Sequence, residues 1–522
     1  MVSRMTNPQN KPAFQSTLTH RPTINFEDAL FLLLYGSKKS YNSRRADRSA
    51  PSLFSNNILY SQSRIDPLVS FRNAEGEAVR GTIINLQRKS LVMEIYNPYS
   101  ILQVSEVLAD VTVRYGSSIA YQGKAVVISL VNTGLTAIAS VTLIDEWHEL
   151  NDIVLAPGAV RAEAQAFVQD WTQRFQIRRD YQIVVNETRA YLADASRWIE
   201  QVDLSNALPK ADGKLRSDVF YELSVPLMEK MKFYFDALNV EASLIEEEAA
   251  PTHRSFVQSA LHPLLLRAPF VFRAFTKPLG YAGDYRMVNQ ILDDPRQGPS
   301  TYFQMVNTAF LQTAVVVAHR NRIDILVNFL RRMADAAMQA GRPFRILNVG
   351  CGPAMEIQRF IQSYSNPEFL SFELVDFSAE TLDWTRDKLT SIIEQIGKPV
   401  TINYVHDSVN QLLKRRFDQS YNSEREFDAV YCAGLFDYLS DKVCLRLTTH
   451  FAARTHLGGS LLVTNVHSNN PEKFSMSHIL EWHLVYRDEV KMTEILPKKC
   501  GATKLYTDST KVNIFAEAII ST

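Results

Sequence analysis

The stretch 344–378 constrains the fold of this chain more than any other. An apolar, strand-like run opens it over 344–349, a turn with Gly350 and Gly352 follows, and a second apolar run after a helical segment ends on Asp376. Glycine lets a ligand approach the backbone, and the helix start behind the turn offers free N–H groups. A carboxylate at the tip of the second strand accepts hydrogen bonds from a ribose diol. The stretch therefore predicts a nucleoside-binding βαβ unit.

More landmarks follow in a fixed order. The run 402–407 predicts a third strand that ends on Asp407, 427–432 a fourth strand, and 460–465 a fifth strand after a Gly-Gly turn. The C-terminal part, 502–520, predicts a closing hairpin. Strands that alternate with helices predict an α/β domain with a parallel sheet.

This order of landmarks resembles class I S-adenosylmethionine (SAM) methyltransferases. The resemblance implies a Rossmann-like domain over 341–522, with a seven-stranded sheet and a C-terminal hairpin, and SAM as the cofactor. Two positions depart from the family pattern, because Asn348 stands where an acid is usual and Ala354 where a third glycine is usual. The resemblance implies that the following residues bind the cofactor: Asn348, Gly350, Gly352, Asp376, Phe377, Asp407, Ser408 and, from a preceding helix, Arg322.

Length and charge restrict the remaining possibilities. A chain of 522 residues is too long for one core, and about two to four domains are expected. Its 56 basic residues balance 56 acidic ones, which argues against a nucleic-acid or anionic-membrane partner. The four cysteines have no C-x-x-C spacing and indicate a reducing compartment. With no signal peptide and no apolar run long enough to span a bilayer, we expect a cytoplasmic protein without an integral membrane segment.

The region before the α/β domain divides into three parts. Residues 1–65 are polar and predict a partly disordered segment. Residues 66–150 show period-two alternation with turns, which predicts a small β-barrel. Residues 155–340 predict helices, with Pro226 interrupting one of them. An aromatic stripe in this helical region predicts helix–helix core or a homodimer seam.

The predicted barrel resembles a PilZ domain, the receptor module for cyclic-di-GMP. The family motif Asn/Asp-x-Ser-x-x-Gly corresponds to 85–90, which lacks both the serine and the glycine. The upstream arginine pair of the family corresponds to Arg44 and Arg48, far from the barrel. We therefore expect a barrel with a supporting or docking role that does not bind cyclic-di-GMP tightly.

Two segments outside the nucleotide motif carry candidate chemistry. The stretch 276–285 combines two glycines with Tyr281, Asp284 and Tyr285, and predicts an interhelical turn or a lid over the active site. The stretch 478–487 predicts a helix on which His483 and Arg487 share a face. Its histidines lack the companions and spacing of a zinc site, so no metal is expected.

Together, the motifs around 280–285, 320–322, 350–354, 465–467 and 481–487 resemble bacterial methyltransferases named for making 3-hydroxypalmitate methyl ester, a quorum-sensing signal. The resemblance implies methylation of the carboxylate of a fatty or 3-hydroxy fatty acid. An ionised carboxylate needs no general base, and none is evident. The residues expected on the acceptor side are, as catalytic groups, Tyr281, Asp284, His467 and Arg487, and, as substrate-binding groups, Tyr285, Trp482, His483 and Tyr486. Methylation of another small molecule or of a protein, and a non-catalytic SAM- or nucleotide-sensing role, remain alternatives.

Overall fold

The computed structural model describes residues 68–147, with gaps at 74–75, 77, 88, 96–101, 116–117, 133–136 and 146, the single positions 161, 165 and 168, and residues 177–521, with gaps at 248, 416–425 and 499. All of them belong to one compact unit, 64–522. The expected disordered segment and the pair Arg44 and Arg48 lie outside the described residues. Within the described part, no helix is long and apolar enough to cross a membrane.

Six antiparallel strands in the described part close into a barrel in the order β1-β2-β3-β6-β5-β4. Their alternating pattern places one face inward, where Leu91, Met93 and Val141 are fully buried. The predicted small barrel is confirmed. The strands are β1 (Leu68–Arg72), β2 (Ala78–Leu86), β3 (Ser90–Ile95), β4 (Val107–Tyr115), β5 (Ser118–Asn132) and β6 (Ala137–Leu143).

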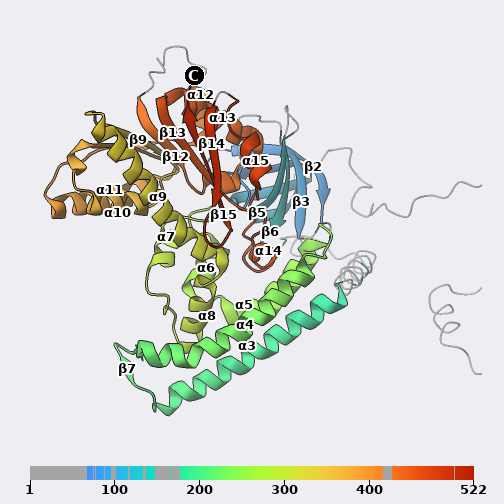
Figure 1. The fold of residues 1–522 in the computed structure, drawn as a ribbon. Helices are drawn as coiled ribbons and strands as arrows, with labels where there is room; N and C mark the ends of the chain where they lie inside the picture. Colours follow the sequence, from blue (N-terminus) through green and yellow to red (C-terminus); the bar gives the residue numbers. More distant parts are fainter. Residues whose placement is uncertain are drawn as a thin grey trace, which may run out of the picture. The chain divides into compact units, whose positions relative to one another are not determined.

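Helices follow the barrel and share a core with α14 (Lys473–Leu480) of the C-terminal region. They are α3 (Arg179–Ser205), α4 (Ser217–Ala242), α5 (Ala250–Leu265), α6 (Pro269–Thr276), α7 (Tyr285–Leu292), α8 (Thr301–Leu311) and α9 (Ala314–Gln339), with the short β7 (Lys210–Ala211) and β8 (Lys214–Leu215) between α3 and α4. In Figure 1 the long helices α3 and α4 run side by side. The expected interruption at Pro226 is wrong, because α4 continues through this residue.

The C-terminal region is built on a seven-stranded sheet in the order β11-β10-β9-β12-β13-β15-β14. The first five strands in this order pair in parallel, and β15 pairs antiparallel with β13 and β14, so the predicted sheet with its closing hairpin is confirmed. The strands are β9 (Phe344–Val349), β10 (Leu370–Asp376), β11 (Thr401–His406), β12 (Phe427–Cys432), β13 (Thr455–Val466), β14 (Cys500–Thr507) and β15 (Asn513–Ile520).

Helices cover both faces of this sheet. One apolar core contains α9, α10 (Met355–Ser363) and α11 (Ala379–Ile396), and a second contains α12 (Val409–Arg415), α13 (Asp441–Arg454) and α15 (Glu489–Glu494). The strand order reverses between β9 and β12. In open α/β sheets, ligands bind beyond the carboxyl ends of the strands at such a reversal.

The barrel contacts the C-terminal region through the loop 102–107. The Val107 N–H donates to the Gly280 carbonyl at 2.7 Å, and the Val104 N–H donates to the Tyr438 carbonyl at 3.3 Å. The Ser105 hydroxyl donates to the His483 carbonyl at 2.8 Å. One barrel loop thus binds three segments that are distant from one another in sequence.

Candidate active site

A cavity lies at the reversal of the strand order and gathers most of the predicted site residues. The predicted residues that line it are Tyr281, Tyr285, Arg322, Asn348, Gly350, Gly352, Asp376, Phe377, Asp407 and Trp482. The remaining predicted residues, Asp284, Ser408, His467, His483, Tyr486 and Arg487, lie outside this lining.

The glycine turn after β9 has the left-handed backbone that its sequence predicts. Gly350 has φ +70°, and a Cβ there would lie 3.2 Å from the Leu435 Cβ, so the loop after β12 packs directly on it. Ala354 replaces the third glycine and still adopts φ +49°, a conformation that is strained for a residue with a Cβ. The Asp376 carboxylate ties the turn together by accepting from the Gly352 N–H at 3.0 Å.

Asp376 also accepts from the Ser378 N–H at 3.0 Å. Its side chain is buried at the end of β10. Burial raises the pKa of this carboxyl, and the N–H donors of Ser378 and Gly352 oppose that rise. Asp407 directly follows β11, is 4% exposed and lines the same cavity. Ser408 lies beside it, but its hydroxyl accepts from the Gln411 N–H at the start of α12.

A buried carboxylate stands beside Asn348, where the family pattern has its acid. The Glu356 Oε1 atom accepts from the Asn348 Nδ2 at 3.2 Å and from the Tyr431 hydroxyl at 2.7 Å. Burial raises the pKa of Glu356, and Glu356 lines the cavity together with Arg322. A carboxyl group in the first turn of α10 therefore lies beside Asn348, an arrangement that the spacing of the β9 motif does not reveal.

The segment between α6 and α7 borders the cavity as an interhelical loop. The Tyr281 ring meets the Phe377 ring edge-on at 4.8 Å between centroids, and burial raises the pKa of Tyr281. A Cβ on Gly283 would lie 2.9 Å from the Tyr438 hydroxyl, which also accepts from the Trp482 Nε1 at 3.2 Å. Tyr438 thus contacts both the loop and the C-terminal wall of the cavity.

Two predicted acceptor-side residues serve the structure of this loop. Asp284 caps α7 by accepting from the Met287 N–H at 3.0 Å, and it forms a buried ion pair with Arg273 at 2.8 Å. Tyr285 lines the cavity, but its hydroxyl donates to Glu380 at 2.8 Å. The expectation that Asp284 faces a substrate is corrected by these contacts, which occupy it at the end of a helix.

The expected helix over 478–487 is wrong beyond its first three residues. The helix α14 ends at Leu480, because Glu481 adopts a left-handed conformation with φ +46°. The chain then runs as an irregular segment to Arg487, which forms a bridge with His467. His483 and Arg487 therefore do not share a helical face.

Arg487 is 1% exposed, and its contacts contradict the role of a substrate-binding cation. Its Nε donates to Asp441 at 2.9 Å, and its Nη1 donates to the Phe436 carbonyl at 2.7 Å and to the Asn465 Oδ1 at 2.5 Å. Its Nη2 donates to the Leu439 carbonyl at 2.6 Å and pairs with Asp441 at 2.8 Å. The guanidinium thereby makes four hydrogen bonds and an ion pair within the protein.

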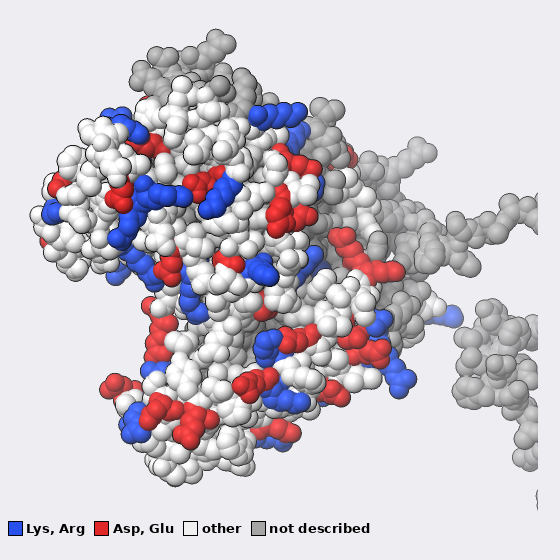
Figure 2. Space-filling model, viewed as in Figure 1, with Lys and Arg blue, Asp and Glu red and all other residues white. Residues whose placement is uncertain are grey.

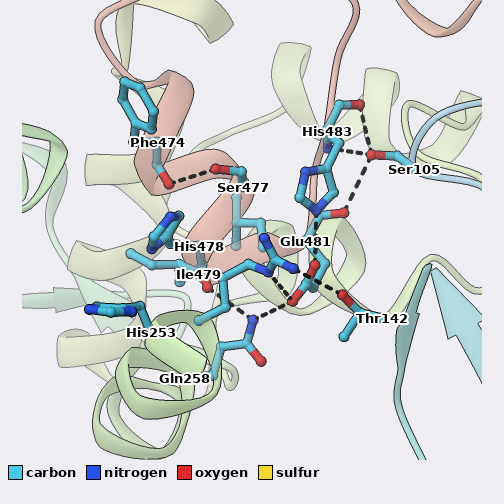
Figure 3. A network of polar contacts seen from close by, with 12 residues as sticks. Ser105, Thr142, His253, Gln258, Phe474, Ser477, His478, Ile479, Glu481 and His483 are labelled. Atoms are coloured by element: carbon cyan, nitrogen blue, oxygen red, sulfur yellow. Dashed lines mark hydrogen bonds and ion pairs between the residues drawn. The ribbon is translucent and has the colours of Figure 1, made fainter. Parts of the chain in front are cut away.

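The two predicted histidines are also held in structural contacts. His467 accepts from the Asn469 N–H at 3.0 Å, and its other ring nitrogen lies 3.4 Å from Glu489. His483 contacts Glu481 at 2.9 Å, in the buried network around the barrel contact shown in Figure 3. Burial lowers the pKa of His483 below its usual value, and the Glu481 carboxylate only partly opposes this shift.

His483 borders a second, shallower cavity between the barrel, α5 and α14. Trp482, Tyr486 and Arg254 line it as well, so Trp482 forms a wall of both cavities. Arg254 is buried and pairs with Glu481 at 3.3 Å. The predicted aromatic residues Trp482 and Tyr486 therefore both line the second cavity, and of the two only Trp482 also reaches the first.

Besides Glu356, a second cavity-lining acid, Asp437, is not indicated by the sequence motifs. It lies in the short helix η2 (Leu435–Tyr438) after β12, is 4% exposed, and accepts from the Val466 N–H at 2.6 Å. Burial raises its pKa to about 6, against the opposing charges of Arg322 and Arg487. The only signal in the sequence is an acid within an apolar run after the fourth strand.

Surface charge and metal ligands add little to this site. On the face shown in Figure 2, basic and acidic side chains are interspersed. Among the described residues, no group of three or more His, Cys, Asp or Glu side chains is placed to hold a metal ion.

Comparisons with known proteins return only distant structural likenesses. No protein-family model and no curated protein matches the chain. A structure described as a possible exported protein from Bordetella parapertussis matches at 13% identity and TM-score 0.37, over 66% of this chain and 96% of that one. Magnesium protoporphyrin IX methyltransferase from Synechocystis PCC 6803, with bound S-adenosylhomocysteine (SAH), matches at 13% identity and TM-score 0.32, over 51% of this chain and 99% of its own.

The N-methyltransferase NodS from Bradyrhizobium japonicum WM9, also in complex with SAH, matches at 12% identity and TM-score 0.28, over 45% of this chain and 97% of its own. Likenesses with TM-scores this low carry no argument about what this chain binds. The functional conclusion therefore depends on the sheet and on the residues of the cavity.

Proposed function

We propose that this protein is a SAM-dependent methyltransferase and that SAM binds in the cavity at the reversal of the strand order. One observation carries the proposal. The glycine turn after β9, the acid Asp376 after β10 and the acid Asp407 after β11 line a single cavity, in a sheet whose strand order and antiparallel closing hairpin are those expected of class I methyltransferases.

The residues of the cavity fit this cofactor. The position where a Cβ of Gly352 would lie is open, with no heavy atom within 4 Å among the described residues, so a ligand has room against the turn. Asp376 would accept from the ribose hydroxyls, and Asp407 and Phe377 would border the adenine. Arg322 would pair with the carboxylate of the methionine part, and Glu356 with its ammonium group. When bound, SAM supplies a methyl group on a sulfonium, and the cavity residues need chiefly to orient donor and acceptor.

The acceptor side supports a small molecule with an apolar part. Helix α7 and the start of α9 contribute apolar side chains to the cavity lining: Met287, Val288, Ile291, Val315 and Val316. This apolar wall supports the predicted acceptor, a fatty or 3-hydroxy fatty acid carboxylate. Arg487 does not support it as the cation that binds the carboxylate, because its guanidinium is used within the protein.

Calorimetry with SAM and SAH tests the proposal. We expect both ligands to bind the full chain, and Asp376→Asn to weaken binding at least about tenfold, because a charge-assisted hydrogen bond contributes about 1.5–3 kcal/mol. The asparagine keeps one oxygen, which can accept from the Gly352 N–H, whereas the Ser378 N–H loses its acceptor. A circular dichroism spectrum like that of the wild type is therefore required of this variant. The matched control is Asp383→Asn, at an exposed residue of α11 paired with Arg386. Unchanged SAM affinity in Asp376→Asn would reject the assignment.

A further inference from the structure

Asp437 is held rigidly at the edge of the cavity by its own backbone and by one side-chain oxygen. Its carbonyl accepts from the Val485 N–H at 2.7 Å, and its N–H donates to the Gly434 carbonyl at 3.3 Å. The Val466 N–H binds the Oδ1 atom at 2.6 Å. The end of β13 thereby fixes one carboxylate oxygen, the segment after α14 fixes the backbone carbonyl, and the residue lines the cavity.

The position of Asp437 in the sheet places it opposite the residues proposed for ribose and adenine. Those residues follow β10 and β11, on one side of the reversal, whereas Asp437 follows β12, on the other side. Tyr438, Trp482 and Val466 line the cavity around it. Arg322, proposed for the methionine carboxylate, also faces Asp437, so the part of the ligand that faces this wall is the methionine part with its sulfonium and methyl group, and the acceptor beside it.

The groups that face Asp437 come from several packed elements. Arg322 on α9 and Arg487 after α14 stabilise its ionised form, whereas burial disfavours that form. Uncharged titratable groups also interact with it electrostatically: Tyr438, Tyr486, Cys432 and Cys444. With a pKa of about 6, the carboxyl is mostly ionised at neutral pH and can still accept a proton.

We propose that Asp437 is the general base of the reaction and that the methyl acceptor is a protic nucleophile, an amine or a hydroxyl on an apolar molecule, rather than a carboxylate. This inference rests on the proposed function. The acceptor nitrogen or oxygen gains the methyl group that SAM supplies, the C–S bond breaks to leave neutral SAH, and the acceptor proton passes to Asp437. An ionised Asp437 would repel a carboxylate acceptor and attract an ammonium or hydroxyl group.

The test needs no knowledge of the acceptor, because sinefungin, a SAM analogue, carries a protonated amine where SAM carries its methyl group. Calorimetry at pH 7.5 should give at least about tenfold tighter binding of sinefungin than of SAH, the effect of one charge-assisted hydrogen bond. Asp437→Asn should abolish most of this preference and change SAH affinity less than about threefold. The asparagine oxygen can still accept from the Val466 N–H, so the loop is retained.

Wild-type protein supplies a second arm that needs no variant. The preference for sinefungin should shrink as the pH falls through about 6, because Asp437 becomes protonated there. The control Asp383→Asn, on the exposed side of α11, should keep the full preference. Equal binding of sinefungin and SAH by the wild type at pH 7.5, or an intact preference in Asp437→Asn, overturns the inference while leaving SAM binding intact. Failure of both ligands to bind the wild type overturns the proposed function itself.

Discussion

Replacing Arg487 with methionine should destabilise the protein strongly, although the residue lies outside the cavity lining. Arg487→Met keeps the length of the side chain and removes the guanidinium. The Asn465 Oδ1 atom then loses its donor at a buried position. The Phe436 and Leu439 carbonyls lose their charged donor and keep weaker partners, the Leu439 N–H at 3.3 Å and the Cys444 thiol at 3.7 Å. A hydrogen bond to a charged group contributes about 1.5–3 kcal/mol, and the retained partners offset part of the loss, so losing the three bonds together costs about 3 kcal/mol.

The ion pair with Asp441 adds little to this sum. The Asp441 side chain is 47% exposed, and water can replace the lost contact. Urea unfolding monitored by circular dichroism should therefore show a free energy of unfolding about 3 kcal/mol lower in Arg487→Met. Arg386→Met, which removes a half-exposed arginine paired with Asp383, is the control and should change it by less than about 0.5 kcal/mol.

A loss below about 1 kcal/mol in Arg487→Met would refute this reasoning, because even one unsatisfied buried acceptor should cost that much. A variant of normal stability with a weakened acceptor KM would instead restore the role first expected from the sequence. The two outcomes separate a structural arginine from one that binds substrate.

Two further changes test other parts of the C-terminal region. Ala354→Gly should raise the free energy of unfolding by about 1 kcal/mol in the same assay, because φ +49° is strained for alanine, and a lower value would show that the Cβ stabilises the turn. Burial raises the pKa of Glu481, but Arg254 and His483 lower it to about 2, so its carboxylate should stabilise the fold above pH 4.5 and lose that contribution as the pH falls toward 2. The thermal unfolding midpoint of wild type should fall more steeply over this window than that of Glu481→Gln, and parallel pH profiles would contradict the prediction.

The glycine turn and the acid at the end of β10 could be predicted, because a few adjacent residues determine each of them. The turn with Gly350 and Gly352 needs left-handed backbone, and Asp376 ends an apolar strand, so both are visible without the fold. Glu356 and Asp437 cannot be recognised from the sequence, because the residues that hold them, Tyr431 and Val466, are brought close only when the sheet forms. A buried acid in an apolar run resembles any surface acid until its neighbours are known.

The prediction for Arg487 failed for a specific physical reason. Spacing of four residues between His483 and Arg487 indicates a shared face only where the helix continues, and α14 ends one residue before the left-handed Glu481. Glutamate rarely adopts this conformation, so no local signal marked the end of the helix. The contacts of Glu481 explain why it adopts this conformation here, because Arg254 and Gln258 from α5 hold its carboxylate.

The barrel's contribution to the cavity follows from the same non-local packing. Gln103 lines the cavity, and the neighbouring residues of the loop 102–107 bind the carbonyls of Gly280, Tyr438 and His483. These three carbonyls belong to the loop after α6, the loop after β12 and the segment after α14, and each of these contributes residues to the cavity wall. The wall beside Asp437 is therefore completed by a domain whose sequence carries no catalytic motif, and a change that shifts the barrel acts on this wall through the three segments whose carbonyls the loop binds.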